Sequence, residues 1–236
     1  MKAVLSAQKA NRVFGAGSGA VHALRDIDME IFPSRLTVLR GRSGSGKTCM
    51  INLLGALDKP TSGKILFEER EISAISENVR DQLRRKNFGF VFQSVALISG
   101  MTALENVEFG LRLAGYPAKE RQSRAEECLE FVGLEKRMRH RPAELSGGEQ
   151  QRVAIARAIA HKPRIIFADE PTAELDSRMG LQIVMTFREL VKKEGATIIM
   201  TTHDPQMIDL SDEVYTLQDG EVIEHILVQG QQGVVL

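Results

Sequence analysis

The stretch that decides the fold reads Gly41-Arg42-Ser43-Gly44-Ser45-Gly46-Lys47-Thr48. It matches the pattern of a phosphate-binding loop (P-loop), in which a lysine and a hydroxyl residue follow the second of two glycines that enclose four residues. An apolar run at 36–39 comes before the loop, and we expect a helix to follow it as far as about Leu57. Strand, glycine-rich loop and helix in this order predict an α/β fold with an anion site at the start of the helix.

The residue types in the loop suit a nucleotide and its metal ion. Glycines allow consecutive N–H groups to point at phosphate oxygens. We expect Lys47 to reach the outer phosphates and the Thr48 hydroxyl to bind Mg²⁺. The alternative is a glycine-rich turn before a helix, with Lys47 in solvent. The remaining nucleotide contacts are expected from the loop residues Gly41, Ser43, Gly44, Ser45 and Gly46.

A second motif, Ile165-Ile166-Phe167-Ala168-Asp169-Glu170, predicts a buried strand that ends in two carboxylates. Nucleotides bind at the carboxyl edge of open α/β sheets, where such side chains are held rigidly. Asp169 is expected to orient Mg²⁺, and Glu170 to polarise the attacking water. The alternative is an acidic pair that caps the turn at 171–172, and the P-loop favours the first interpretation.

Composition limits the classes of function. Lys+Arg and Asp+Glu both total 31, so the net charge is +0 and no overall field steers the chain toward nucleic acid. Two cysteines, Cys49 and Cys128, cannot form a disulfide framework, and no signal-peptide pattern is visible at the start, so we expect a cytoplasmic setting. No run approaches the roughly 18 to 20 apolar residues that cross a bilayer. Membrane work is therefore expected to go through a partner.

Apolar periodicity predicts the order of the remaining elements. Segments 3–14 and 22–31 alternate apolar with polar residues and predict strands of an antiparallel sheet. The stretch 76–161 is rich in helix signals, with helices expected at 77–85, 103–114, 119–131 and 148–160 around a strand at 88–92. Two further strands are expected at 164–168 and 197–201, with an amphipathic helix at 177–194 between them.

A third motif, Leu145-Ser146-Gly147-Gly148-Glu149-Gln150-Gln151-Arg152, places a serine and two glycines at a helix start. Free N–H groups and the positive end of the helix dipole make this a second anion site, which the chain's own P-loop does not need. A second phosphate site on one chain implies a second chain.

This octet and the two nucleotide motifs resemble those of ATP-binding cassette (ABC) ATPases, and the resemblance covers the chain from Val4 to about Glu224. It implies a P-loop NTPase fold with a RecA-like core sheet and an antiparallel β subdomain. A helical subdomain inserted at about 94–160 would carry the octet, which is the signature of the family. The ATPase domain would span 1–225, and 226–236 would form a loosely held tail.

The resemblance also implies the cofactors, ATP and Mg²⁺, and a homodimer in which each signature caps the γ-phosphate held by the other subunit's P-loop. In that arrangement the signature contacts come from Ser146, Gly147, Gly148 and Glu149.

Further site residues follow from the same resemblance. Phe14 would stack on adenine, and Gln93 would join the helical subdomain to the metal and the attacking water. His203 would contact the γ-phosphate and support Glu170, and Asp176 would cross the dimer interface. Cys49 stands where a hydroxyl residue is usual, so its contact with the α-phosphate is expected to be weaker.

Finer motifs at 90–93, 102–107, 141–144 and 167–172 resemble the branch of ATPases for lipoprotein release, macrolide export, and haem or antimicrobial-peptide export. The resemblance implies a separately encoded permease of several spans, docked on segment 95–106, and a place on the cytoplasmic face of the membrane. The alternative is a soluble ABC ATPase that acts on DNA or ribosomes. The former class inserts long coiled coils and the latter carries two cassettes, and neither feature is present.

Overall fold

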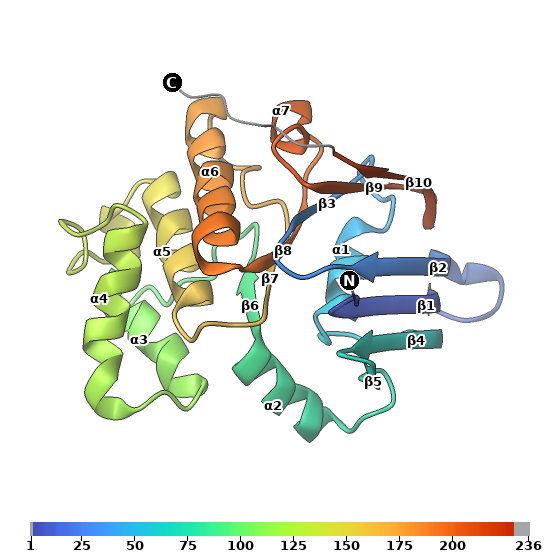
Figure 1. Cartoon of the computed structure of the whole chain (residues 1–236), viewed down its shortest axis with the longest axis horizontal. Helices are drawn as coiled ribbons and strands as arrows, with labels where there is room; N and C mark the ends of the chain where they lie inside the picture. The colour runs from blue at the N-terminus through green and yellow to red at the C-terminus, as the bar shows by residue number, and fades with distance from the viewer. Residues whose placement is uncertain (1, 229–236) are drawn as a thin grey trace.

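Two β-sheets built from distant parts of the chain form the frame of the molecule (Figure 1). The computed structural model describes residues 2–228. The smaller sheet has the strand order β2-β1-β4-β5, and the larger has the order β10-β9-β3-β8-β7-β6.

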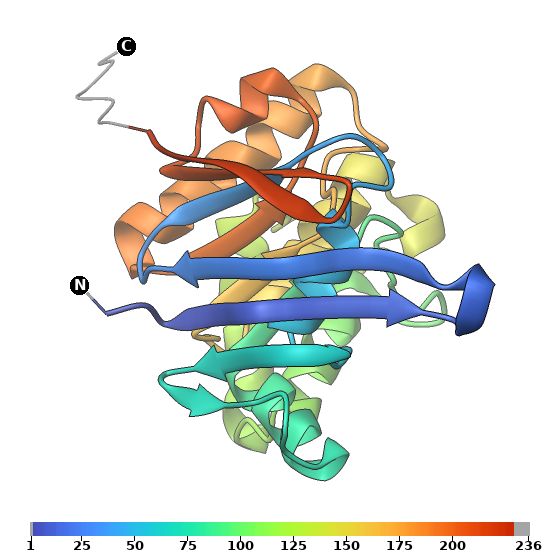
Figure 2. The same ribbon diagram turned by 90° about the vertical axis from the view of Figure 1, so that its right-hand side faces the viewer.

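The smaller sheet is antiparallel throughout and faces the viewer in Figure 2. The predicted antiparallel pairing of its first two strands is confirmed, because the ladder runs from Leu5 opposite Ile31 to Phe14 opposite Val21. Its other two strands were not predicted. The strands are β1 (Leu5–Phe14), β2 (Val21–Ile31), β4 (Ser62–Phe67) and β5 (Arg70–Glu71).

The larger sheet is parallel from β9 to β6, and β10 adds an antiparallel edge. Strands β7 and β8 are buried along their whole length, as their apolar sequences predict for a sheet covered on both faces. The carboxyl ends of the parallel strands meet at one edge, where the P-loop and the two carboxylates follow. The strands are β3 (Leu36–Arg40), β6 (Phe88–Val91), β7 (Ile165–Ala168), β8 (Thr197–Thr201), β9 (Glu213–Gln218) and β10 (Glu221–Leu227).

Helices α3, α4 and α5 contact one another and gather on the side of the larger sheet away from the smaller one (Figure 1). Helix α1 follows β3 after the P-loop, and α6 lies between β7 and β8 in the chain. The helices are α1 (Lys47–Leu54), α2 (Glu77–Asn87), α3 (Ala103–Leu113), α4 (Arg121–Phe131), α5 (Gly147–Ile159), α6 (Ser177–Glu194) and α7 (Pro205–Ile208). Within residues 2–228, no helix has the length and apolar character needed to span a membrane.

The predicted boundaries agree with the structure to within two residues, except at two places. Helix α1 ends at Leu54 rather than near Leu57, because Gly55 caps it and Ala56 adopts a positive φ of 55°. Strand β10 includes residues 226 and 227, which the sequence analysis assigned to a loosely held tail. Residues 229–236 of that predicted tail lie outside the described residues.

The core is divided between the two faces of the larger sheet. One cluster packs α3 to α6 against the sheet, with Phe187 and Leu129 fully buried. The other packs α1 and the antiparallel sheet against the opposite face, where Phe167 meets Phe88 edge to face. Side chains of β7 alternate between the two clusters, so this strand is the centre of the molecule.

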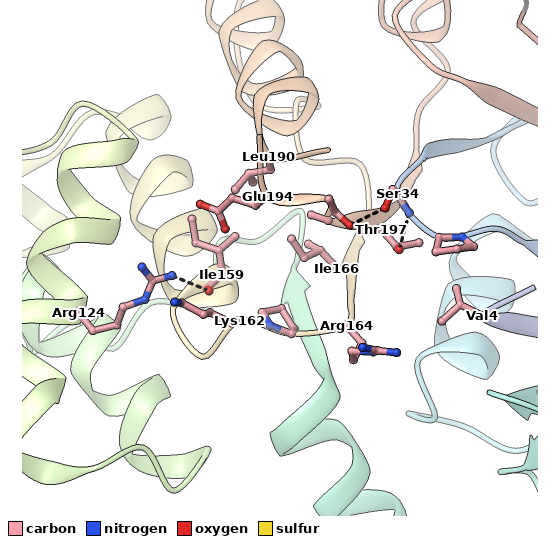
Figure 3. A pocket seen from close by; sticks show the side chains of 14 residues that line it. Val4, Ser34, Arg124, Ile159, Lys162, Arg164, Ile166, Leu190, Glu194 and Thr197 are labelled. Carbon is pink, nitrogen blue, oxygen red and sulfur yellow. Dashed lines mark hydrogen bonds between the residues drawn. The ribbon is translucent and has the colours of Figure 1, made fainter. Parts of the chain in front are cut away.

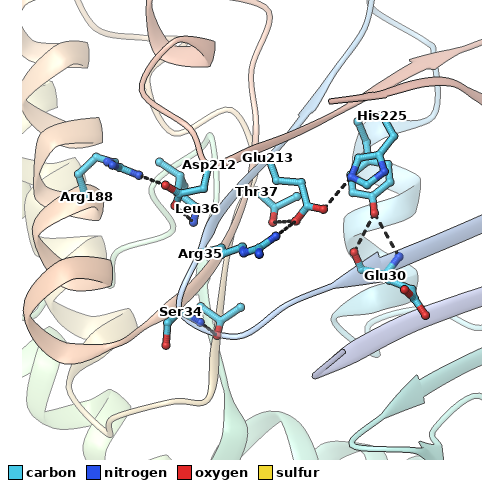
Figure 4. Close-up of polar contacts among 11 residues, drawn as sticks. Glu30, Ser34, Arg35, Leu36, Thr37, Arg188, Asp212, Glu213 and His225 are labelled. Atoms are coloured by element: carbon cyan, nitrogen blue, oxygen red, sulfur yellow. Dashed lines mark hydrogen bonds and ion pairs between the residues drawn. The ribbon is translucent and has the colours of Figure 1, made fainter. Parts of the chain in front are cut away.

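The β9–β10 hairpin is joined to the rest by a polar network (Figure 4). Glu213, which is 0% exposed, contacts the Thr37 hydroxyl at 3.4 Å and the His225 ring nitrogen at 2.7 Å. The His225 ring stacks on Tyr215 with centroids 4.0 Å apart. The Tyr215 hydroxyl donates to the main-chain oxygen of Glu30 and so joins the hairpin to β2. Burial of the phenol is the main cause that raises its pKa to about 12.

Candidate functional site

The P-loop joins β3 to α1 and leaves the start of that helix open. Gly44 and Gly46 have φ values of +79° and +104°, which side chains rarely adopt. A Cβ on Gly46 would lie 2.7 Å from the main-chain oxygen of Ala23, so only glycine fits between the loop and β2. No side chain caps α1, and the first N–H groups of a helix have no intrahelical acceptor. The loop therefore offers main-chain donors to an anion.

Lys47 is buried at the base of the loop, with 6% of the residue exposed. Its ammonium donates to the main-chain oxygens of Gly41 at 3.0 Å and Arg42 at 3.3 Å. It also pairs with a Glu170 carboxylate oxygen at 3.4 Å. The lysine and the predicted catalytic carboxylate thus share one site.

Asp169 and Glu170 follow β7 and are held by a hydroxyl from the neighbouring strand. Thr201, at the end of β8, donates to the Asp169 carboxylate at 2.7 Å and accepts from the Glu170 N–H at 2.7 Å. The Thr48 hydroxyl donates to the same Asp169 oxygen at 3.2 Å. Glu170 has a φ of +42°, a conformation that costs energy in a residue with a side chain. The Thr201 contact stabilises that conformation.

His203 completes the arrangement around Glu170. Its Nδ1 lies 3.2 Å from Oε2 of the Glu170 carboxylate, whereas Lys47 contacts Oε1. Each carboxylate oxygen therefore has one partner. The histidine side chain is 69% exposed, whereas the Glu170 side chain is 22% exposed. The buried Lys47 ammonium therefore holds Glu170 in place, and the exposed His203 ring is accessible to solvent or a ligand.

A cavity of about 810 Å³ opens above these groups. Its lining combines loop residues with side chains that follow three strands, so the structure brings together the predicted P-loop residues of this cavity with Gln93, Glu170 and His203. The lining includes Ala23, Arg42, Ser43, Gly44, Gly46, Lys47, Thr48, Cys49, Gln93, Glu170 and His203. Gly41 and Ser45 line a neighbouring cavity of about 450 Å³.

Cys49 lies in the lining as a half-buried thiol. Burial, assisted by the charge of Asp58 and opposed by Arg12, raises its pKa to about 11. The thiol is therefore protonated at neutral pH and is a weak hydrogen-bond donor.

The predicted signature lies elsewhere on the molecule. Within the described part of the chain, none of residues 145–152 lines the 810 Å³ cavity. Ser146 is the N-cap of α5: its hydroxyl accepts from the Glu149 N–H, and the Glu149 carboxylate accepts from the Ser146 N–H. That contact and the nearby Arg137 guanidinium, 3.0 Å away, lower the pKa of Glu149. The N–H groups of Gly147 and Gly148 have no intrahelical acceptor in such a cap.

Three other predicted residues also lie outside the cavity lining, and one of them, Asp169, is next to it through its contact with Thr48. The other two are Phe14 and Asp176. Phe14, at the end of β1, is 45% exposed. Asp176 is the N-cap of α6 and accepts from the Met179 N–H at 2.9 Å. Both residues lie where a ligand or a second chain has access to them.

A separate cavity of about 550 Å³ lies at the opposite, N-terminal edge of the parallel sheet (Figure 3). Two of its polar side chains have main-chain partners within the chain. Arg124 donates to the main-chain oxygen of Ala160, and the Ser34 hydroxyl donates to that of Gly195. It contains no pairing of lysine, hydroxyl and carboxylate like the one at the other edge.

Comparison with known proteins gives the family. A family model described as ABC transporter matches residues 24–173. The chain belongs to this family. It is 45% identical, over 94% of both chains, to an uncharacterized ABC transporter ATP-binding protein of Thermotoga maritima. It is 44% identical to the macrolide export ATP-binding/permease protein MacB of Marinobacter nauticus, of which it spans 34%.

Solved structures of ABC cassettes have the same fold. The ATP-binding cassette MJ0796, in a dimeric post-hydrolysis state bound to ADP and Pi, has a TM-score of 0.89 and 37% identity, over 96% of this chain and 99% of that one. CbiO1 from Clostridium perfringens, part of the transporter complex cbiONQ, has a TM-score of 0.86 and 31% identity, over 97% of this chain and 90% of that one. The predicted P-loop NTPase fold is confirmed, and the chain is an ABC-type ATPase that hydrolyses ATP to ADP and phosphate.

Thr201 is the site residue that sequence analysis missed. In the sequence, Thr201 is marked only as a hydroxyl residue at the end of an apolar run, just before Thr202 and His203. The structure shows that it is fully buried. A threonine in a β-strand is ordinary. Its contact with Asp169 depends on the parallel pairing of β7 with β8, which the local sequence does not state.

Proposed function

We propose that two copies of this chain bind two MgATP between them and drive a conformational change in a separately encoded membrane permease. The proposal rests on the separation of two anion sites in the fold. The signature at 145–152 contributes no residue to the lining of the P-loop cavity. A second copy related by a two-fold axis would bring each signature onto the other copy's P-loop. The dimeric cassette MJ0796 bound to ADP and Pi supports this arrangement.

The P-loop cavity suits MgATP. Thr48 and Asp169 present hard oxygen atoms to one point, and Gln93 lines the same cavity. Residues 2–228 hold no cluster of three or more His, Cys, Asp or Glu side chains around a metal site. The remaining ligands of a Mg²⁺ ion would therefore come from phosphate and water, as is usual for this ion. When bound, the ion would neutralise charge on the phosphates.

In this proposal Glu170 orients water against the γ-phosphorus while His203 holds the carboxylate and contacts the γ-phosphate. Lys47 and the N–H groups of the loop stabilise charge on the transferring group, together with Ser146 of the second copy. Catalysis is then positioning and electrostatic stabilisation rather than covalent chemistry. Closure of the dimer is a shift of population toward the state in which the γ-phosphate bridges the two copies.

The substitution Glu170→Gln tests this scheme. It keeps the shape of the side chain and removes the group that activates water, so we expect kcat for ATP to fall by about 10² to 10⁴. With hydrolysis blocked, the variant is expected to elute as a dimer in MgATP and as a monomer without nucleotide. Glu135→Gln, at an exposed position away from the cavity, is the matched control. Dissociation of the Glu170→Gln protein to monomer in saturating MgATP would count against the scheme.

An apolar groove supports a permease partner. It measures about 410 Å³, and its lining includes arginines and, from the predicted docking segment, Ala96 and Ile98. Leu113 and Ile98 are 49% and 38% exposed there, so an apolar helix from a partner would bury them. The aromatic side chains that line the groove are Phe88, Phe90, Phe92 and Phe109.

The groove is tested by Leu113→Glu, with Ile223→Glu on β10 as the control. Ile223 is 56% exposed and lies outside the groove. We expect only Leu113→Glu to lose a multi-span membrane protein that co-purifies with the tagged chain in mild detergent, while MgATP hydrolysis by the isolated chain is unchanged. Equal recovery of the membrane protein with both variants would place the permease contact elsewhere.

The relatives support one type of transport. Similarity to macrolide export proteins, and the motifs noted above, support export or lipoprotein release at the cytoplasmic face of the membrane. The co-purifying membrane protein tests this directly, since its own sequence would identify the class of cargo. Recovery of ribosomes or DNA instead would favour a soluble ABC ATPase.

A further inference from the structure

Arg12 forms a contact that the family motifs do not include. Arg12 and Phe14 are two residues apart on β1, a spacing that places side chains on the same face of a strand. The Arg12 guanidinium carbon lies 4.4 Å from the centre of the Phe14 ring. This is the geometry of a cation–π contact. Arg12 therefore covers one face of the ring, and the 45% exposure of Phe14 leaves room at the other.

Asp58 fixes the orientation of that guanidinium. Its two carboxylate oxygens accept from Arg12 Nε at 2.7 Å and from an Arg12 terminal nitrogen at 3.1 Å. Such a two-point pairing fixes the plane of the guanidinium as well as its position. The side chains are only 23% and 33% exposed, so the pair is partly shielded from water.

The pair also connects two parts of the site. Asp58 lies four residues beyond the end of α1, and its N–H donates to the Asn52 main-chain oxygen within that helix. Arg80 of α2 holds the Asp58 main-chain oxygen at 2.6 Å. At the start of α1, Cys49 is close enough for the charges of both Arg12 and Asp58 to act on its pKa. The P-loop helix and the Phe14 ring are thus held to each other through Arg12.

We propose that Arg12 is a positioning residue for the nucleotide base: it holds the Phe14 ring against one face so that the opposite face is ready to stack on adenine. This rests on the proposed function, in which Phe14 is the base platform. Arg12 does not touch the nucleotide in this scheme. It reduces the rotational freedom of the Phe14 ring before the nucleotide binds. Its positive charge, on the face of the ring opposite the base, adds attraction for an aromatic base.

The Arg12 guanidinium contacts the Phe14 ring and Asp58, and within the described residues it makes no hydrogen bond to the P-loop. Replacing Arg12 is therefore expected to change base binding much more than phosphate binding. A purely structural residue would change both together. Comparison of ADP with inorganic pyrophosphate, which lacks the base, separates the two effects without hydrolysis.

The experiment measures dissociation constants for MgADP and for inorganic pyrophosphate by displacement of a fluorescent ADP. Arg12→Met is expected to weaken ADP binding by about threefold to tenfold, the scale of a partly shielded cation–π contact. Pyrophosphate binding is expected to stay within about twofold, because the P-loop is unchanged. Arg12→Lys keeps the charge but not the planar group, and should give an intermediate loss for ADP. Asp58→Asn should change ADP binding in the same direction as Arg12→Met.

Phe14→Ala is the control for the base platform, and pyrophosphate binding shows that each variant retains a folded P-loop. If Phe14→Ala weakens ADP selectively and Arg12→Met does not, the inference about Arg12 is wrong and the proposed site stands. If Phe14→Ala leaves the ratio of the two constants unchanged, the platform itself is wrong and the inference falls with it. Equal weakening of ADP and pyrophosphate in Arg12→Met, or tighter ADP binding, would also overturn the inference.

Discussion

Replacing Gly46 by alanine tests the close fit between the P-loop and the antiparallel sheet. The new Cβ would lie 2.7 Å from the Ala23 main-chain oxygen and 2.9 Å from a Leu24 methyl carbon, with φ at +104°. Backbone strain of this kind costs about 1–3 kcal/mol. Moving the loop or β2 apart to relieve the contacts adds about 1–3 kcal/mol, as in an overpacked core. We expect the free energy of unfolding to fall by about 2–6 kcal/mol, a large part of the stability of a domain.

Gly44→Ala is the matched control for this prediction. Its φ is +79°, but nothing lies within 4 Å of the position of the added Cβ, so only the backbone term of about 1–2 kcal/mol applies. The assay is urea unfolding followed by circular dichroism, with the denaturant dependence compared between variants. A Gly46→Ala protein no less stable than Gly44→Ala would refute the steric reasoning and leave backbone conformation as the sole demand on this glycine.

Three further predictions concern the buried Glu213, the hydroxyl of Thr201 and the two cysteine thiols. His225→Ala removes the 2.7 Å partner of the fully buried Glu213 carboxylate and should lower the free energy of unfolding by about 1–3 kcal/mol; an unchanged urea midpoint would show that its other partners suffice. Thr201→Val removes the donor to the Asp169 carboxylate and the acceptor of the Glu170 main-chain N–H, so kcat for ATP and the melting temperature should both fall, and retention of both would contradict that assignment. Cys49 and Cys128, whose thiols have a pKa of about 11 because burial disfavours the thiolate, should react with iodoacetamide at pH 8 roughly a hundredfold more slowly than glutathione. Rapid labelling before urea is added would mean that the thiols are less buried than the structure shows.

Local sequence signals account for the parts of the fold that were predicted. The P-loop, the strand before Asp169 and the cap at Ser146 each depend on neighbouring residues, and each has a distinctive spacing. The buried strands at the centre of the larger sheet are continuous apolar runs, which need no knowledge of their partners. Such elements are recognisable before any tertiary contact is known.

The missed strands lack those signals for physical reasons. Strand β4 begins with Ser62-Gly63-Lys64, three exposed residues, and it is a strand because it pairs with β1. Strand β9 begins with Glu213, a carboxylate in a fully buried position, which interrupts the apolar pattern. The burial of Glu213 is explained by partners from β3 and β10, and those contacts exist only in the folded chain. Position in the fold, rather than residue type, decides both cases.

The sequence predicted candidate residues for the site, but it did not predict how their side chains contact one another. The sequence identified Lys47 and Glu170 as separate groups, one for phosphate and one for water, but it did not indicate that they pair with each other at 3.4 Å. That pairing has a consequence for the proposed cycle. In that cycle, a γ-phosphate that binds the Lys47 ammonium would compete with the Glu170 carboxylate for it. His203, 3.2 Å from the other carboxylate oxygen, would then be the contact that orients Glu170 toward water. In the proposed cycle, arrival of the phosphate would therefore free one Glu170 carboxylate oxygen from Lys47 to accept a hydrogen bond from water.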